Sequence, residues 1–207
     1  DRESPERYQA DFQFIVNEEL ELIFEEIKAL LAERKYAQLY ARVKTLQPAD
    51  IALLFEEIPM EDVILTFRLL PKDTAAETFV ELEPERQMLL ISAFSDTELK
   101  AVLDELYLDD TVDIIEDMPA NVVSRILRNT DAATRSQINQ LLNYPEDSAG
   151  SIMTTEFVYL HPDATVEESF ARIRQVGVDK ETIYTCYVTR RRKLEGVVTV
   201  KALLLSS

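Results

Sequence analysis

The chain has 207 residues, of which 46% are hydrophobic, and a formal net charge of −17 at pH 7. This length can bury one ordinary core and part of a second. The acidic balance disfavours binding to nucleic acid or anionic membranes and favours cations or basic partners. The sequence has no apolar run of membrane-spanning or secretory type, so we expect a soluble segment. Cys186 is the single cysteine, which excludes an internal disulfide and fits a reducing compartment.

The first predicted element is a long amphipathic helix over residues 12–31. Apolar residues recur at helical spacing from Phe12 to Leu31, and glutamates occupy the other faces. Such a helix covers another surface or pairs with a partner. We assign residues 1–35 to an N-terminal amphipathic helical extension.

Residues 36–143 predict an acidic array of short helices. Prolines fall near the starts of segments about ten residues long, where the first turn of a helix tolerates them, and two such helices form a repeat of about 24 residues that is typical of a superhelix. Residues 46–118 hold 19 Asp and Glu against four basic residues. Nine positions set twelve residues apart are apolar with one exception: Leu46, Ile58, Leu70, Leu82, Phe94, Leu106, Met118, Thr130 and Leu142.

Residues 144–207 predict a joint and the start of a small α/β module. The joint runs from Asn143 to Gly150, and β-forming residues follow it. We expect a strand over 157–160, a helix over 165–176 with a capping box, two strands over 183–189 and 194–200, and a helix from Lys201. The basic run 190–193 is expected to be an exposed hairpin turn that could also dock on an acidic face. One such unit could hardly cover both faces of its sheet, so we expect the module to continue past Ser207.

The strongest candidate for a metal site is the segment 108–113, Leu-Asp-Asp-Thr-Val-Asp. Its i, i+4 spacing places Asp109 and Asp113 on one helix face, where two carboxylates about 6 Å apart repel by about 2–3 kcal/mol at an effective dielectric constant of ~20. A divalent ion would relieve this repulsion, and oxygen ligands favour magnesium or calcium. The alternative is structural: Asp109 caps a helix, and Asp113 belongs to a solvated charged face.

The joint Tyr-Pro-Glu-Asp-Ser-Ala-Gly-Ser-Ile-Met-Thr (144–154) leads into a half-module that ends Glu-Gly-Val-Val-Thr (195–199). Together with the helical array, this order resembles the cytosolic part of the MgtE family of magnesium channels and transporters. The resemblance implies a mainly α fold, with a superhelical N domain followed by a partial α/β CBS module at the cytoplasmic face of the membrane. It also implies regulatory Mg²⁺ bound by Asp109, Asp113 and Glu77, the last within Leu-Pro-Lys-Asp-Thr-Ala-Ala-Glu (70–77). The expected partners are a second CBS module and a membrane pore beyond Ser207, and a second copy in a homodimer.

Nucleotide binding and catalysis have weaker support in the sequence. CBS modules that bind adenine nucleotides often end Gly-x-x-Thr/Ser-x-x-Asp, but this chain has Gly196 and Thr199 with Ala202 in place of the Asp, and Thr185 where some MgtE proteins place a Tyr. His161 has no second histidine to share a metal and is expected at the surface. The resemblance implies a magnesium-sensing regulator, and we expect no enzymatic activity. The alternatives are an acidic docking module for a basic partner and an adenine-nucleotide-sensing CBS regulator.

Overall fold

A computed structural model describes residues 5–145 and 148–206, with the side chains of residues 5–18 and 179 excepted. The chain forms two compact units. The first comprises Asp1–Leu106 and Asp117–Thr130, and the second comprises Tyr107–Glu116 and Asp131–Ser207. The second unit therefore includes one helix from within the acidic array.

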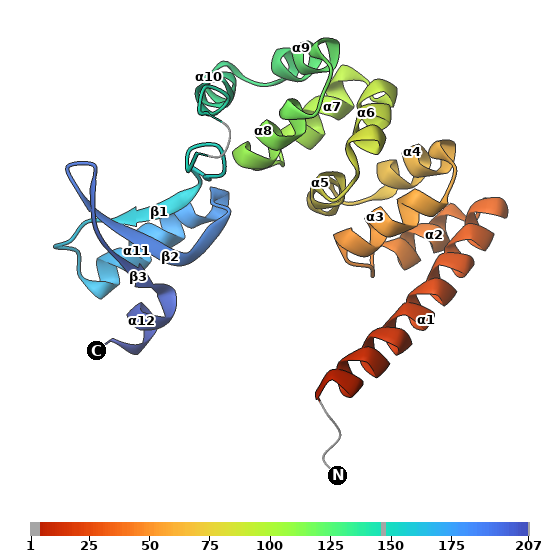
Figure 1. Cartoon of the computed structure of the whole chain (residues 1–207), viewed down its shortest axis with the longest axis horizontal. Helices are drawn as coiled ribbons and strands as arrows, with labels where there is room; N and C mark the ends of the chain where they lie inside the picture. Colours follow the sequence, from red (N-terminus) through yellow and green to blue (C-terminus); the bar gives the residue numbers. More distant parts are fainter. Residues whose placement is uncertain (1–4, 146–147, 207) are drawn as a thin grey trace. The chain divides into compact units, whose positions relative to one another are not determined.

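The first unit consists of helices, most of them about ten residues long (Figure 1). The short helices pack mainly against the next helix but one, as α3 with α5, α5 with α7 and α7 with α9, which is the packing expected of a superhelical array. The helices are α1 (Pro5–Ala32), α2 (Tyr36–Val43), α3 (Pro48–Glu57), α4 (Met60–Leu69), α5 (Lys72–Val80), α6 (Pro84–Ala93), α7 (Asp96–Leu103) and α9 (Ala120–Asn129).

The twelve-residue repeat marks the helix ends. Ile58, Leu70 and Phe94 are the C-terminal capping residues of α3, α4 and α6, and they are buried or half-buried. A second register, four positions earlier in the chain, supplies the helix interiors: Leu54 and Leu90 are fully buried. The repeat therefore arises because each helix and its link together span twelve residues.

Helix starts follow local signals. Pro48 and Pro84 occupy the first turn of α3 and α6, as predicted. At α7, Ser95 forms a capping box with Glu98. The neighbouring Asp96 therefore does not cap this helix; its carboxylate accepts a hydrogen bond from Arg125 Nε at 3.0 Å.

Phe67 contacts three other aromatic rings in the core of the first unit. Its ring lies 6.5 Å from Phe55, 6.2 Å from Phe79 and 5.2 Å from Phe94, measured between centroids. These rings come from α3, α4, α5 and the end of α6. Aromatic contacts of this kind add to area burial, so they link successive turns of the array.

The second unit contains two helices of the array and a small α/β module. It contains α8 (Leu108–Glu116), α10 (Ala132–Leu141), β1 (Phe157–Leu160), α11 (Val166–Val176), η1 (Gly177–Asp179), β2 (Thr182–Arg190), β3 (Lys193–Thr199) and α12 (Val200–Leu205). The strand order is β1-β2-β3, with β1 parallel and β3 antiparallel to β2. The predicted strands and the capping box of Thr165 with Glu168 are confirmed.

One face of this sheet carries the core of the α/β module. Ile173 of α11 and Leu203 of α12 pack with Val158, Leu160 and Cys186 of the strands. Within the described residues, no helix combines the length and apolar character needed to cross a bilayer.

Candidate functional site

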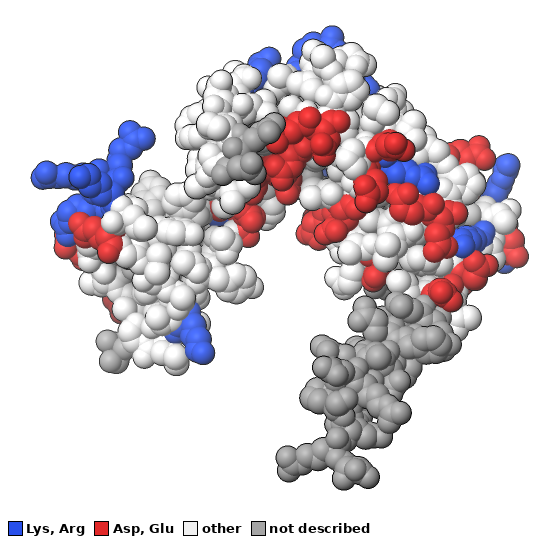
Figure 2. Space-filling model, in the orientation of Figure 1, with Lys and Arg blue, Asp and Glu red and all other residues white. Residues whose placement is uncertain are grey.

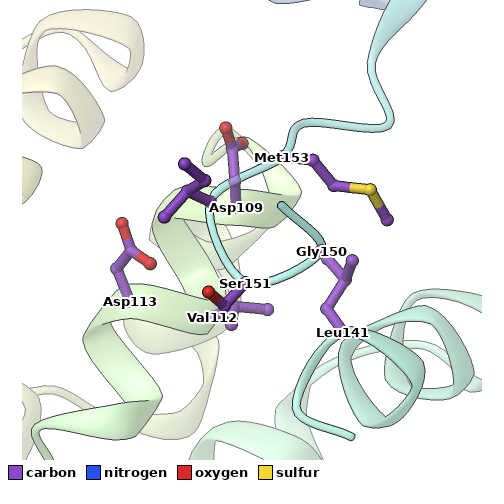
Figure 3. Close-up of a pocket in the computed structure, with 8 residues that line it drawn as sticks. Asp109, Val112, Asp113, Leu141, Gly150, Ser151 and Met153 are labelled. Atoms are coloured by element: carbon purple, nitrogen blue, oxygen red, sulfur yellow. The ribbon is translucent and has the colours of Figure 1, made fainter. Parts of the chain in front are cut away.

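Asp109 and Asp113 lie on α8, four residues apart, as the sequence predicts. They line a small open cavity of about 140 Å³, together with Leu141 of α10 and the loop residues 150–153. Figure 3 shows that the two carboxylates come from one helix and that the loop crosses beside them. Asp109 is half-buried, whereas Asp113 is exposed.

The start of α8 is tied to a distant segment of the same unit. The backbone N–H of Leu108 donates to Glu156 Oε2 at 2.9 Å, which places a further carboxylate at the first turn. An acidic side chain is favourable at this end of a helix because the unpaired N–H groups carry partial positive charge. Local sequence cannot reveal this contact, since the two residues are 48 positions apart.

Asp109 Oδ1 is buried and has no hydrogen-bond partner among the described residues. Burial raises the pKa of Asp109, and backbone N–H groups at the start of α8 partly oppose the shift, while Glu181 and Glu156 add to it. A buried carboxylate oxygen without a partner is costly. A cation held beside it would remove that cost.

The carboxyl group of Asp110 has a strongly raised pKa. Burial, followed by the charges of Asp109 and Asp113, raises its pKa to about 6, and Glu181 and Glu156 contribute further. Five carboxylates of the second unit therefore interact electrostatically around the start of α8. Asp110 belongs to the predicted motif, which assigns it no role, and no local sequence signal points to Glu156 or Glu181.

The chemistry of the cluster fits a weakly held divalent cation better than an enclosed metal centre. Among the described residues, no group of three or more His, Cys, Asp or Glu side chains could by itself hold a metal ion. Asp109 and Asp113 would thus provide two oxygen ligands, and water would complete the coordination. Glu77 lies exposed on α5 in the first unit, so it belongs to a different unit from the pair.

Thr199 and Ala202, two positions of the nucleotide-binding pattern discussed above, lie at the start of α12. Thr199 caps this helix, and its hydroxyl oxygen accepts a hydrogen bond from the backbone N–H of Ala202 at 3.1 Å. Ala202 has no side chain that could hold a ribose. His161 is exposed, as predicted, with its Nδ1 3.4 Å from Asp163 Oδ2.

Comparison with protein families gives two matches in sequence order. Residues 46–147 match the MgtE intracellular N domain, and residues 149–206 match the CBS domain. Among curated proteins, the chain is 31% identical over 169 residues to the magnesium transporter MgtE of Thermus thermophilus, covering 79% of this chain and 37% of that protein. It is 28% identical over 177 residues to MgtE of Bacillus subtilis, covering 85% of this chain and 39% of that protein. The chain thus spans about two fifths of the length of these relatives.

Two solved structures share the fold. One is the cytosolic domain of the Mg²⁺ channel MgtE in complex with ATP, with a TM-score of 0.82 and 31% identity over 89% of this chain and 76% of that one. The other is the soluble part of a magnesium transporter, with a TM-score of 0.80 and 22% identity over 91% of this chain and 75% of that one. The chain therefore belongs to the MgtE family, of which it carries the intracellular N domain followed by a CBS domain.

Proposed function

We propose that this chain is the Mg²⁺-sensing regulatory part of a magnesium channel or transporter, and that Asp109 and Asp113 hold the regulatory ion. The observation that carries the proposal is the buried, unpartnered Oδ1 of Asp109 in a cavity that Asp113 also lines. Curated relatives of the chain are named magnesium transporters, which supports Mg²⁺ as the ion.

The proposed mechanism is electrostatic. Without a cation, the charges of Asp109 and Asp113 oppose each other by about 2–3 kcal/mol at the ~6 Å spacing of i, i+4 side chains and an effective dielectric constant of ~20. Both charges also raise the pKa of Asp110. Mg²⁺ offsets this repulsion and supplies positive charge to Asp109 Oδ1. Because Mg²⁺ keeps several waters, such a site binds weakly, as a sensor of a common ion requires.

One weak site is too little to switch a channel. A site at ten times its dissociation constant contributes about 1.4 kcal/mol, whereas moving an equilibrium from 1:99 to 99:1 takes about 5.5 kcal/mol. About four sites acting together would suffice. We therefore include Glu77 as a ligand of a further site, and propose that Mg²⁺ draws the N domain and the CBS modules together, which closes the attached pore.

The proposed partners are a second CBS module, a membrane pore and a second copy of the protein, at the cytoplasmic face of the membrane. The sheet face opposite the core supports a further module, because Tyr159 is 54% and Val197 59% exposed there. Apolar side chains on an uncovered sheet face favour another protein surface. In this role the chain regulates transport and catalyses no reaction.

The test is a magnesium titration followed by thermal unfolding, with potassium chloride added to hold the ionic strength constant. We expect a saturable rise in Tm of about 3–6 °C at ten times the dissociation constant. The variant Asp109→Asn with Asp113→Asn should lose this rise. The control Glu81→Gln with Glu85→Gln removes two exposed carboxylates of the first unit and should keep it. An equal response in both variants would remove the α8 pair from the mechanism.

Adenine-nucleotide binding is a second candidate, because the relative with 31% identity was solved in complex with ATP. In this chain, Thr199 is engaged in capping α12, and Ala202 offers no carboxylate for a ribose. Thermal unfolding with ATP in the presence of a chelator tests this function. A saturable rise in Tm would support it, and an unchanged Tm would restrict the chain to ion sensing.

A further inference from the structure

The turn of the β2–β3 hairpin is built from two arginines. Arg190 pairs with Lys193 in the ladder, and Arg191 and Arg192 form the two-residue turn between them. Both have positive φ, 51° for Arg191 and 66° for Arg192. Short hairpin turns of this kind normally use Asn and Gly, because other side chains reach this backbone region at an energetic cost. The turn conformation therefore does not explain why arginines occupy it.

The neighbouring side chains fix the base of this turn and leave its end charged. Arg190 donates to Asp163 at 3.0 and 3.3 Å and to Glu195 at 3.0 Å. Arg191, Arg192 and Lys193, which we call the basic tip, are exposed, and none of them forms an ion pair within the described chain. The blue side chains at the left edge of Figure 2 lie over this end of the hairpin.

The basic tip lies at the end of the antiparallel ladder formed by β2 and β3. The ladder between β2 and β3 runs from Thr185 and Thr199 to the pair at the turn. The ladder fixes the backbone of the tip, and each guanidinium of the tip can donate two parallel hydrogen bonds to one carboxylate. These features suit recognition of an acidic surface.

We propose that the basic tip binds residues 46–118 of the acidic helical array in a second copy of this chain. This segment carries 19 acidic residues against four basic ones. Three of those four are already in ion pairs with its own carboxylates: Arg68 with Glu98, Arg86 with Glu56 and Lys100 with Asp104. Many of its remaining carboxylates are exposed, among them Glu61, Glu77, Glu81, Glu83 and Glu85. A net charge of −17 opposes the approach of the chain to an anionic membrane and, at long range, to a second copy, so the proposed contact depends on short-range pairing of the tip with exposed carboxylates of the array.

The first test measures self-association of the whole chain by sedimentation equilibrium in a chelator at low and at high salt. The chelator makes the result independent of the proposed Mg²⁺ site. Arg191→Asn with Arg192→Gly removes two charges and supplies the residues that the turn prefers. We expect the tip variant to associate about tenfold more weakly than the wild type at low salt, and we expect added salt to reduce this difference between the two proteins. Arg128→Gln with Lys201→Gln, a control at two exposed residues elsewhere, should change association less than threefold. A wild type that stays monomeric at low salt, or equal association of the tip variant and the wild type, would overturn the proposal.

The second test identifies the surface that the tip contacts. A photoreactive benzoylphenylalanine replaces Arg192 in chains of natural isotope content, which are mixed with isotopically heavy chains before irradiation. We expect crosslinked peptides that join a light hairpin to residues 46–118 of a heavy chain. Crosslinks confined to single chains, or to other segments, would overturn the proposal. Binding of the wild type to vesicles with 30% phosphatidylglycerol, lost in the tip variant, would assign the tip to a membrane and would also overturn it.

Discussion

Two threonines of the array should weaken the fold that contains them. Thr66 of α4 and Thr78 of α5 are both 0% exposed, and neither hydroxyl oxygen has a hydrogen-bond partner among the described residues. They stand twelve residues apart, in the register where Leu54 and Leu90 fill the core. Valine has almost the same shape and the same branching at Cβ, so Thr66→Val and Thr78→Val remove a buried polar group without creating a cavity.

The size of the effect follows from the cost of an unsatisfied buried hydroxyl, about 1–3 kcal/mol. Relaxation recovers part of this, so we expect each variant to raise the free energy of unfolding by about 1 kcal/mol and the double variant by about 2 kcal/mol. The assay is guanidinium unfolding followed by circular dichroism, with hydrogen exchange to locate the stabilised helices.

Thr111 provides the matched control. It is 3% exposed, but its hydroxyl donates to the carbonyl of Tyr107 at 3.0 Å. Thr111→Val breaks that bond and should lower stability by about 0.5–1.5 kcal/mol. If Thr66→Val and Thr78→Val also lowered stability, both hydroxyls would have partners in solution, and the reasoning from unsatisfied burial would be refuted.

Three further predictions concern charged groups. The pKa of Asp110 is raised to about 6, so its carboxyl binds a proton more tightly in the folded chain and stability falls as pH rises from about 4 to 6. In urea unfolding with a chelator, Asp110→Asn should be as stable as the wild type near pH 4. Above pH 6 it should be more stable by about 1 kcal/mol, after allowance for solvent screening. Hydrogen bonds from Arg68 and, to a smaller extent, from Ser95 lower the pKa of Glu98 to about 2. The wild type should therefore be more stable than Glu98→Gln above about pH 4.5, and this advantage should vanish as pH falls towards 2. An advantage independent of pH would contradict this prediction. Arg125 donates hydrogen bonds to two backbone carbonyls at the end of α6 and forms an ion pair with Asp96. Arg125→Met should therefore lower stability by about 2–3 kcal/mol, whereas Asp96→Asn should lower it by under 1 kcal/mol. Equal losses in thermal unfolding would show that the ion pair matters and the bonds to the carbonyls do not.

Local signals in the sequence were sufficient to predict where the helices and strands lie. Pro48 and Pro84 place helix starts, and the spacing of Thr165 and Glu168 gives a capping box, because these effects act within one turn. The strand over 157–160 agrees with the prediction residue for residue. The mainly helical fold with a small terminal sheet was therefore predictable.

The surroundings of the α8 pair could not be predicted in the same way. The contact of Leu108 with Glu156 and the influence of Glu181 on Asp110 depend on the chain's return from distant positions. The grouping of α8 with the α/β module likewise rests on packing against α10, which no local pattern encodes. Spacing predicted that Asp109 and Asp113 share a helix face, but not that one oxygen of Asp109 is buried.

The most direct measurement of the central claim is an NMR titration of the chain with Mn²⁺, a paramagnetic ion that accepts the same oxygen ligands as Mg²⁺. We expect selective broadening of amide signals at residues 108–113 and 150–153, and recovery of these signals when excess Mg²⁺ competes. Broadening spread over the acidic array, with the α8 signals unaffected, would contradict a site at Asp109 and Asp113.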